Sequence, residues 1–262
     1  MQEIIIATLT VGVIGLLIGI ALVTVSRKFY VEVDEREAEV RKWLPGNNCG
    51  ACGYAGCDAV AAAIVKKEAA VNVCSVANTE ALAKISEIMG VEAVQAIRKV
   101  AFVKCAGDCH HTNEKCHYIG IRDCRSAAMA GLSIWECDYG CLGLGSCAEA
   151  CPNDGIVVSD GVAVVDRDKC VGCGLCVSAC PKNLIEVIRA DKKVAVRCSN
   201  HDRGPAVRKV CNIGCIGCKL CEKQCEHNAI KVEGNVAHIS YDQCAGCGKC
   251  EEKCPSQIIT KL

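Results

Sequence analysis

The feature that most constrains this chain is the segment CVGCGLCVSACP, which carries four cysteines and a proline at residues 170–181. Its spacing is C-x2-C-x2-C-x3-C-P, and a second copy, CAGCGKCEEKCP, occupies residues 244–255. This spacing is typical of bacterial ferredoxins with two 4Fe–4S clusters, in which three cysteines of one run hold one cluster and the fourth ligates the other. Because such runs work in pairs, each copy requires a partner run.

Two further cysteine runs are the predicted partners, and both depart from the pattern. CIGCKLCEKQC at residues 215–225 keeps the spacing but is followed by Glu226 where a proline would stand. CLGLGSCAEACP at residues 141–152 has Leu144 in the position of the second cysteine. Cys137, four residues before this run, is the nearest candidate for the missing ligand.

The crossed rule then predicts four cluster sites within the two pairs of runs. The predicted ligand sets are Cys170, Cys173 and Cys176 with Cys151; Cys141, Cys147 and Cys180 with Cys137; Cys215, Cys218 and Cys221 with Cys254; and Cys244, Cys247 and Cys250 with Cys225. Between the paired runs, residues 155–165 and 229–240 have β-branched residues on both sides of a turn signal. These two segments predict β-hairpins of the kind that flank ferredoxin clusters.

A different cysteine pattern lies nearer the N-terminus, in the segment NCGACGYAGC. Its cysteines follow the spacing C-x2-C-x4-C-x16-C, and they are Cys49, Cys52, Cys57 and Cys74. Four thiolates complete one 4Fe–4S cluster, and the interleaved glycines allow backbone N–H groups to approach the cluster sulfur. A zinc site with four cysteines is the alternative for this segment.

An internal repeat relates two parts of the chain. The spacing Cys124-x12-Cys137-x3-Cys141 recurs as Cys198-x12-Cys211-x3-Cys215. Upstream, AFVKC at residues 101–105 resembles VAVRC at residues 194–198. The cysteine-rich part is therefore predicted to contain two copies of one ferredoxin-bearing unit.

Six cysteines lie outside these sets: Cys105, Cys109, Cys116, Cys124, Cys198 and Cys211. They allow one further cluster, for which Cys105, Cys109 and Cys124 are candidates and the fourth member is open, with Cys198 and Cys211 also available. We predict Cys116 to be a free thiol and the nearby His110, His111 and His117 to be solvated. The cofactors expected are five or six 4Fe–4S clusters.

The composition excludes several classes of protein. Cysteine accounts for 26 of 262 residues, but a disulfide scaffold is typical of short secreted chains, which this chain is not. The formal net charge of zero gives no general attraction to nucleic acid. The sequence has neither a dinucleotide-binding G-x-G-x-x-G after a strand nor a P-loop, so we expect relay of single electrons and no hydride chemistry.

Residues 4–25 contain no charged side chain and are long enough to cross a bilayer as a helix. The start, MQE, lacks the basic residue of a signal peptide. Arg27 and Lys28 follow the apolar stretch, and the positive-inside rule places them in the cytoplasm. We therefore predict a single-pass anchor in the cytoplasmic (inner) membrane of the cell, with the cysteine-rich part on the cytoplasmic side.

The predicted fold class is α+β, with an anchor at 1–28, a small helical 4Fe–4S domain at 29–104, and two ferredoxin-like units at 105–197 and 198–262. Two details accompany this division. Residues 30–48 predict a short helix followed by a loop. Residues 79–100 predict two helical stretches that meet near Gly90, with Thr79 as the N-cap.

Residues 189–209 carry seven lysines and arginines against two aspartates. Soluble ferredoxins tend to be acidic, so one hypothesis is that this segment attracts a ferredoxin electrostatically. The alternative is an ordinary solvated surface.

The segment LPGNNCGACGYAGC with Cys74, placed after an apolar span and before ferredoxin modules, resembles the B subunit of the Rnf complex. This membrane complex is a ferredoxin:NAD+ oxidoreductase, a translocase that couples electron flow to Na+ or H+ transport. The resemblance covers essentially the whole chain, although shorter family members carry only one ferredoxin pair.

The resemblance implies that the chain accepts electrons from reduced ferredoxin and passes them through 4Fe–4S clusters toward the flavin-bearing and NAD-binding subunits. It implies no catalytic residue in this chain alone, and the lipid bilayer and the other Rnf-type subunits as partners. Two alternatives stay open: a membrane-anchored polyferredoxin that serves a hydrogenase or heterodisulfide-type complex, and a zinc-binding interaction module.

Overall fold

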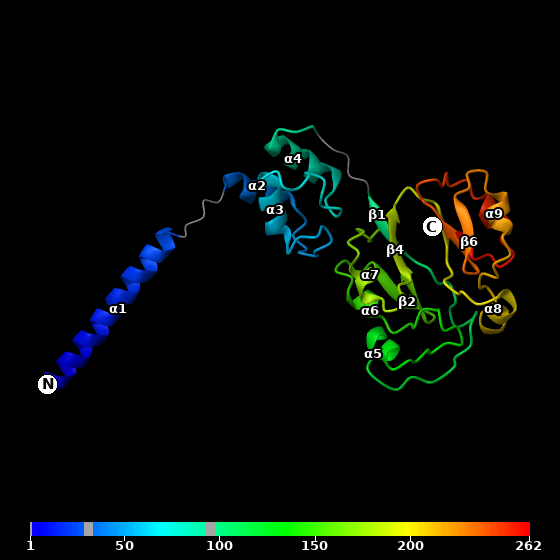
Figure 1. Ribbon diagram of the computed structural model, residues 1–262, viewed down its shortest axis with the longest axis horizontal. Helices are drawn as coiled ribbons and strands as arrows, with labels where there is room; N and C mark the ends of the chain where they lie inside the picture. Colours follow the sequence, from blue (N-terminus) through cyan, green and yellow to red (C-terminus); the bar gives the residue numbers. More distant parts are fainter. Residues whose placement is uncertain (1, 29–33, 93–97) are drawn as a thin grey trace.

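The computed structural model describes residues 2–28, 34–92 and 98–262, in an order that runs from an N-terminal helix to two cysteine-rich units (Figure 1). Helix α1 spans Gln2–Lys28. Among the residues with described structure, no helix combines the length and the apolar character that a membrane span requires. The predicted span at 4–25 therefore stays a prediction.

Three helices form the small domain that follows: α2 (Glu35–Trp43), α3 (Cys57–Val65) and α4 (Thr79–Met89). Their apolar faces meet around Val40, Ile64 and Ile85, which are at most 1% exposed. The short helix predicted within 30–48 is confirmed as α2.

The ends of α4 differ in part from the prediction. Its N-cap is Asn78, whose side chain accepts a hydrogen bond from the Ala81 N–H at 2.8 Å, and Thr79 is the first helical residue. Gly90 ends the helix with φ +65°, a conformation that glycine adopts without strain. The second predicted helical stretch falls largely on residues 93–97, outside the described residues, and a strand begins at Lys99.

The first ferredoxin-like unit contains two antiparallel strand pairs. Strand β1 (Lys99–Val103) pairs with β4 (Ile185–Arg189), and β2 (Ile156–Ser159) pairs with β3 (Val162–Val165). The second pair is the predicted hairpin. Because β1 belongs to this sheet, the unit begins before residue 105, and residues 99–103 do not belong with the small helical domain.

The second unit repeats this arrangement. Strand β5 (Val194–Val196) pairs with β8 (Ile259–Lys261), and β6 (Ile230–Glu233) pairs with β7 (Val236–Ile239) as predicted. In both units a strand that precedes the cysteine runs pairs with a strand that follows them. The predicted repeat is confirmed at the level of strand pairing, and the second unit begins before residue 198.

Short helices complete both units. They are α5 (Cys124–Met129), α6 (Ser146–Glu149) and α7 (Leu175–Ala179) in the first unit, and α8 (Gly204–Val210), α9 (Leu220–Gln224) and α10 (Lys249–Glu252) in the second. Four of these, α6, α7, α9 and α10, begin within or next to a cysteine run, so each places one or more thiols beside the strands.

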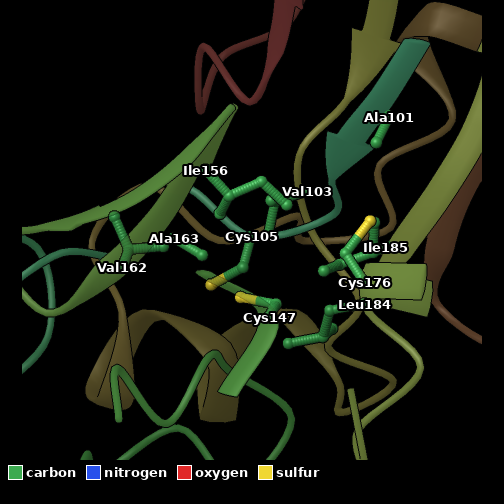
Figure 2. Packing of buried hydrophobic residues seen from close by; sticks show 10 residues of the cluster. All are labelled: Ala101, Val103, Cys105, Cys147, Ile156, Val162, Ala163, Cys176, Leu184 and Ile185. Carbon is green, nitrogen blue, oxygen red and sulfur yellow. The ribbon is translucent and has the colours of Figure 1, made fainter. Parts of the chain in front are cut away.

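Cysteine side chains are part of the hydrophobic cores. Figure 2 shows the sulfur atoms of Cys105, Cys147 and Cys176 among the aliphatic side chains of the first unit. The second core likewise includes Cys215 and Cys221 beside its valines and isoleucines. The strands and short helices therefore enclose thiols where a larger domain would enclose aromatic rings.

Candidate metal centres

Five cavities have cysteine thiols on their walls. One lies in the small helical domain and is lined by Cys49, Cys52, Cys57 and Cys74. Cys57 is the first residue of α3, and its backbone N–H donates to Asn48 Oδ1 at 2.8 Å. The structure therefore brings together the four cysteines that the spacing predicted.

The second unit contains two of these cavities, and each cavity is lined by cysteines from both cysteine runs of the unit. One is lined by Cys215, Cys218, Cys221 and Cys254, and the other by Cys225, Cys244, Cys247 and Cys250. Both sets are the crossed sets predicted from the ferredoxin pattern. The fourth cysteine of each run reaches the opposite site because the two runs lie side by side around the β6–β7 hairpin.

In the first unit, Cys151 joins the three leading cysteines of the 170–181 run, as predicted. Burial raises the pKa of Cys176 to about 12, and the charges of Cys170, Cys173 and Cys151 add to this rise. Cys151 and Cys170 pack against the same core as the buried Cys176, so with Cys173 of the same run they form the sixth candidate centre.

The partner site in the first unit differs from the prediction. Its cavity is lined by Cys124, Cys141, Cys147 and Cys180, so Cys124 takes the place that the sequence assigned to Cys137. Cys124 comes to this place because it is the first residue of α5. Leu144 occupies the second-cysteine position of the run, so the run lacks one thiol. Cys124, twenty positions upstream of Leu144, supplies that thiol.

Two polar side chains fix the start of α5 in this position. Asp123 caps the helix by accepting from the Ser126 N–H at 2.7 Å. Ser146 Oγ donates to Asp123 Oδ1 at 2.8 Å and accepts from the Cys124 N–H at 2.7 Å. These hydrogen bonds hold the pKa of Asp123 at about 2. Asp123 and Ser146 are positioning residues that the sequence pattern did not single out.

The fifth of these cavities lies between the two units. Its walls carry Cys105 and Cys137 from the first unit and Cys198 and Cys211 from the second, and Cys141 also borders it. Cys105 and Cys198 follow the equivalent strands β1 and β5, while Cys137 and Cys211 each lie four residues before a cysteine run. Each unit therefore contributes the same two positions to this central site.

The sulfur atoms of the central site converge. A Cβ atom built on Gly107 would lie 3.3 Å from Cys211 Sγ and 3.9 Å from Cys105 Sγ. Asn200, which is 2% exposed, donates from Nδ2 to Cys137 Sγ at 3.4 Å and from its backbone N–H to Cys198 Sγ at 3.5 Å. Asn200 thus orients one thiol from each unit, and no sequence motif had marked it.

Backbone N–H groups connect the central site with its neighbours. The Cys141 N–H points to Cys105 Sγ at 3.5 Å, and the Cys215 N–H donates to Cys198 Sγ at 3.3 Å. In each unit the backbone of the first cysteine of a run thus contacts the sulfur of the cysteine that follows strand β1 or β5. The central site is joined in the same way to one site in each unit.

Burial makes these thiols poor acids. It raises the pKa of Cys105 to about 12, of Cys147 to about 12, and of Cys198 to about 11. A thiolate at these positions requires a compensating cation, and hydrogen bonds from backbone N–H groups to sulfur stabilise the same charged form. Four converging thiols with N–H donors suit a 4Fe–4S cluster.

Two cysteines, Cys109 and Cys116, belong to none of these centres. Cys109 is exposed, and neither Cys109 nor Cys116 lines any of the five cavities formed by the described residues. Cys116 Sγ instead donates to the Ser133 carbonyl at 3.4 Å. The structure therefore does not support Cys109 as a cluster ligand, whereas Cys105, Cys124, Cys198 and Cys211 all reach a cavity.

Three family models for iron–sulfur proteins match parts of this chain. A model described as "Putative Fe-S cluster" matches residues 44–76. A 4Fe-4S binding domain model matches residues 163–186, and a 4Fe-4S dicluster domain model matches residues 214–258. The chain therefore contains 4Fe–4S ferredoxin-like domains.

Three curated relatives, all B subunits of redox complexes, are similar over most of the chain. The one from the Na+-translocating ferredoxin:NAD+ oxidoreductase complex of Acetobacterium woodii is 43% identical, over 89% of this chain and 70% of the relative. The one from the ion-translocating oxidoreductase complex of Methanosarcina acetivorans is 39% identical, over 94% of both chains. The one from the proton-translocating ferredoxin:NAD+ oxidoreductase complex of Clostridium ljungdahlii is 40% identical, over 93% of this chain and 87% of the relative.

Because Cys124 and Cys137 lie in different sites, two double variants are expected to lose different amounts of iron. Cys124→Ser with Cys141→Ser removes two ligands of one site and should cost about 4 iron atoms per chain from a total of about 24. Cys124→Ser with Cys137→Ser damages two sites and should cost about 8. Iron analysis of anaerobically purified protein measures both losses.

Cys116→Ser is the matched control for these variants and should keep the full iron content. Equal iron loss in the two double variants would mean that Cys124 and Cys137 share one site, as the sequence had suggested.

Proposed function

Because the chain belongs to the family of B subunits of Rnf-type ion-translocating ferredoxin:NAD+ oxidoreductase complexes, we propose that it relays electrons from reduced ferredoxin toward the other subunits. The observation that carries this proposal is the series of six four-cysteine groups described above. Bound 4Fe–4S clusters supply one-electron carriers at such positions. We propose the 24 cysteines of the six groups as their ligands.

The side chains and backbone of this chain prepare the sites for that role. Burial excludes water from thiols such as Cys105, and peptide N–H groups donate to sulfur at Cys105, Cys170 and Cys198. Both effects tune the reduction potential of an iron–sulfur centre. Asn200 adds a side-chain donor at the central site, the place where the two units meet.

The proposed order of the relay follows the contacts between neighbouring groups. The central site links the second unit to the first through Cys198 and Cys105. Toward the N-terminus, the next group along the chain is Cys49, Cys52, Cys57 and Cys74 of the small helical domain, and we place it after the sites of the first unit.

We propose that ferredoxin docks at the second unit. Two of its ligand cysteines, Cys218 and Cys247, are exposed, so two sites lie close to solvent there. The basic segment 189–209 is only partly free for docking. Lys192 Nζ donates to the Cys244 carbonyl at 3.2 Å and Arg197 donates to the Cys105 carbonyl at 3.3 Å.

The exposed cations of this segment are Arg189, Lys193, Arg203, Arg208 and Lys209, and Arg189 is paired with Asp191 at 2.9 Å. Arg208 and Lys209 lie in the last turn of α8, and Arg203 is its N-cap. These three side chains are the proposed point of attraction for an acidic ferredoxin.

We further propose that α1 anchors the chain in the inner membrane, with the cysteine-rich part in the cytoplasm. Its 27 residues extend about 40 Å, enough for a bilayer core of about 30 Å. Leu9, Leu16 and Leu22 are more than 60% exposed, and exposed apolar surface of this extent requires an apolar environment. The relatives' membership in ion-translocating complexes supports the same location.

Cys198→Ser in the assembled complex tests the relay. The variant lacks one ligand of the central site, so ferredoxin-dependent NAD+ reduction by membranes should fall at least about tenfold, with about 4 iron atoms lost. Cys116→Ser should keep the wild-type rate. A Cys198→Ser complex that loses the central cluster and still reduces NAD+ at the full rate would refute the relay.

Charge reversal on α8 tests the docking site. Arg203→Glu combined with Arg208→Glu and Lys209→Glu should raise the apparent KM for ferredoxin about tenfold at low salt and less at high salt, because exposed charges are screened. The rate with an artificial electron donor should not change. An unaltered KM at low salt would exclude this surface as the docking site.

Removal of residues 1–28 tests the anchor. The full-length chain, expressed alone in membranes, should resist extraction by alkaline carbonate, whereas the shortened chain should be extracted with its iron content intact. Extraction of the full-length chain under the same conditions would contradict the proposed span.

A further inference from the structure

One group of metal-ligating side chains lies apart from the six cysteine groups. Ligand atoms of Cys109, His110 and Asp160 lie within 4.8 Å of one another, and all three residues are exposed. Sulfur, imidazole nitrogen and carboxylate oxygen are the donors that zinc binds in proteins. We propose that this triad binds one divalent metal ion of the zinc class, with water as the fourth ligand.

The two segments that supply the ligands are already joined by the backbone. The Cys109 N–H donates to the Asp160 carbonyl at 2.8 Å, although the two residues are far apart in the sequence. Ser159 Oγ donates to Asp160 Oδ2 at 3.0 Å and orients the carboxylate. The distance between the ligands is therefore set before any ion binds, which lowers the entropic cost of binding.

The β2–β3 turn that carries Asp160 is fixed by packing. Asp160 and Gly161 both have positive φ, at +52° and +81°. A Cβ atom at Gly161 would lie 2.2 Å from Cζ2 of Trp135, so the turn rests directly on this indole ring. The carboxylate thus stands on a turn with little freedom to move.

The loop that carries Cys109 and His110 is equally well held. The His110 N–H donates to Asp108 Oδ1 at 2.9 Å, and His111 Nδ1 lies 2.6 Å from the same oxygen. Thr112 Oγ1 donates to the Val210 carbonyl at 2.7 Å and ties the loop to the end of α8. Because Asp108 is engaged by these partners, Asp160 is the carboxylate left to meet an ion.

The charges of the triad suit a divalent ion and do not suit an iron–sulfur cluster. A Cys109 thiolate and the Asp160 carboxylate together carry two negative charges, which one divalent cation balances. A 4Fe–4S cluster requires four ligands of the thiolate type, and this triad has one. A bound ion would therefore clip the loop after Cys105 to the β2–β3 turn, beside the central site.

Protection from alkylation tests this site in the intact, cluster-loaded protein. Among the 26 cysteines, all of which the structure describes, only Cys109 and Cys116 lie outside the six groups. A short iodoacetamide pulse under anaerobic conditions, followed by peptide mass spectrometry, measures both rates in one sample. We expect Zn2+ to slow alkylation of Cys109 at least about tenfold, by coordinating the thiolate that reacts, and EDTA to restore the rate.

Cys116 is the internal control and should react at the same rate with and without Zn2+. Asp160→Asn and His110→Ala should each weaken the protection of Cys109, while an unchanged iron content shows that clusters and fold are intact. The proposal is overturned if Zn2+ leaves the Cys109 rate unchanged, or if both variants protect Cys109 as well as the wild type does. Neither readout depends on electron relay, so this test is separate from those of the proposed function.

Discussion

The bond between buried sulfur and metal is the interaction on which the rest of this structure depends. The chain has few aromatic residues, and its cores are closed by thiols such as Cys105, Cys176 and Cys221. Burial raises the pKa of these thiols, so their charged form requires a cation beside the sulfur. In small domains built around metal, binding of the metal is coupled to folding.

Sequence spacing predicted the local part of the candidate sites and failed where ligands come from distant segments. Within a run, short-range geometry places the first three cysteines around one centre, and the crossed rule then supplies residues such as Cys151 and Cys254. The spacing within a run could not place Cys124 beside Cys141, because that contact depends on α5 and on hydrogen bonds of Asp123 and Ser146. Proximity along the chain favoured Cys137, which instead faces the second unit.

The internal repeat held a signal that could have corrected this error. Aligning the repeats on their outer strands, β1 with β5, pairs Cys105 with Cys198 and leaves Cys124 without a counterpart. The second unit has Cys218 where the first has Leu144, so the unmatched Cys124 is the natural replacement. The hairpins were predicted well because their turns are local, whereas β1–β4 and β5–β8 join strands too far apart for turn chemistry to reveal.

Each unit supplies half of the cysteines of the central site, so the site depends on both copies of the repeat. One unit alone supplies only two of its four sulfur ligands, so the site could arise only once two copies stood together. The pairing is pseudo-symmetric, with the same two positions used from each copy, as in an interface between identical subunits. The two copies together thus form a centre that neither contains alone, and loss of either copy would destroy it.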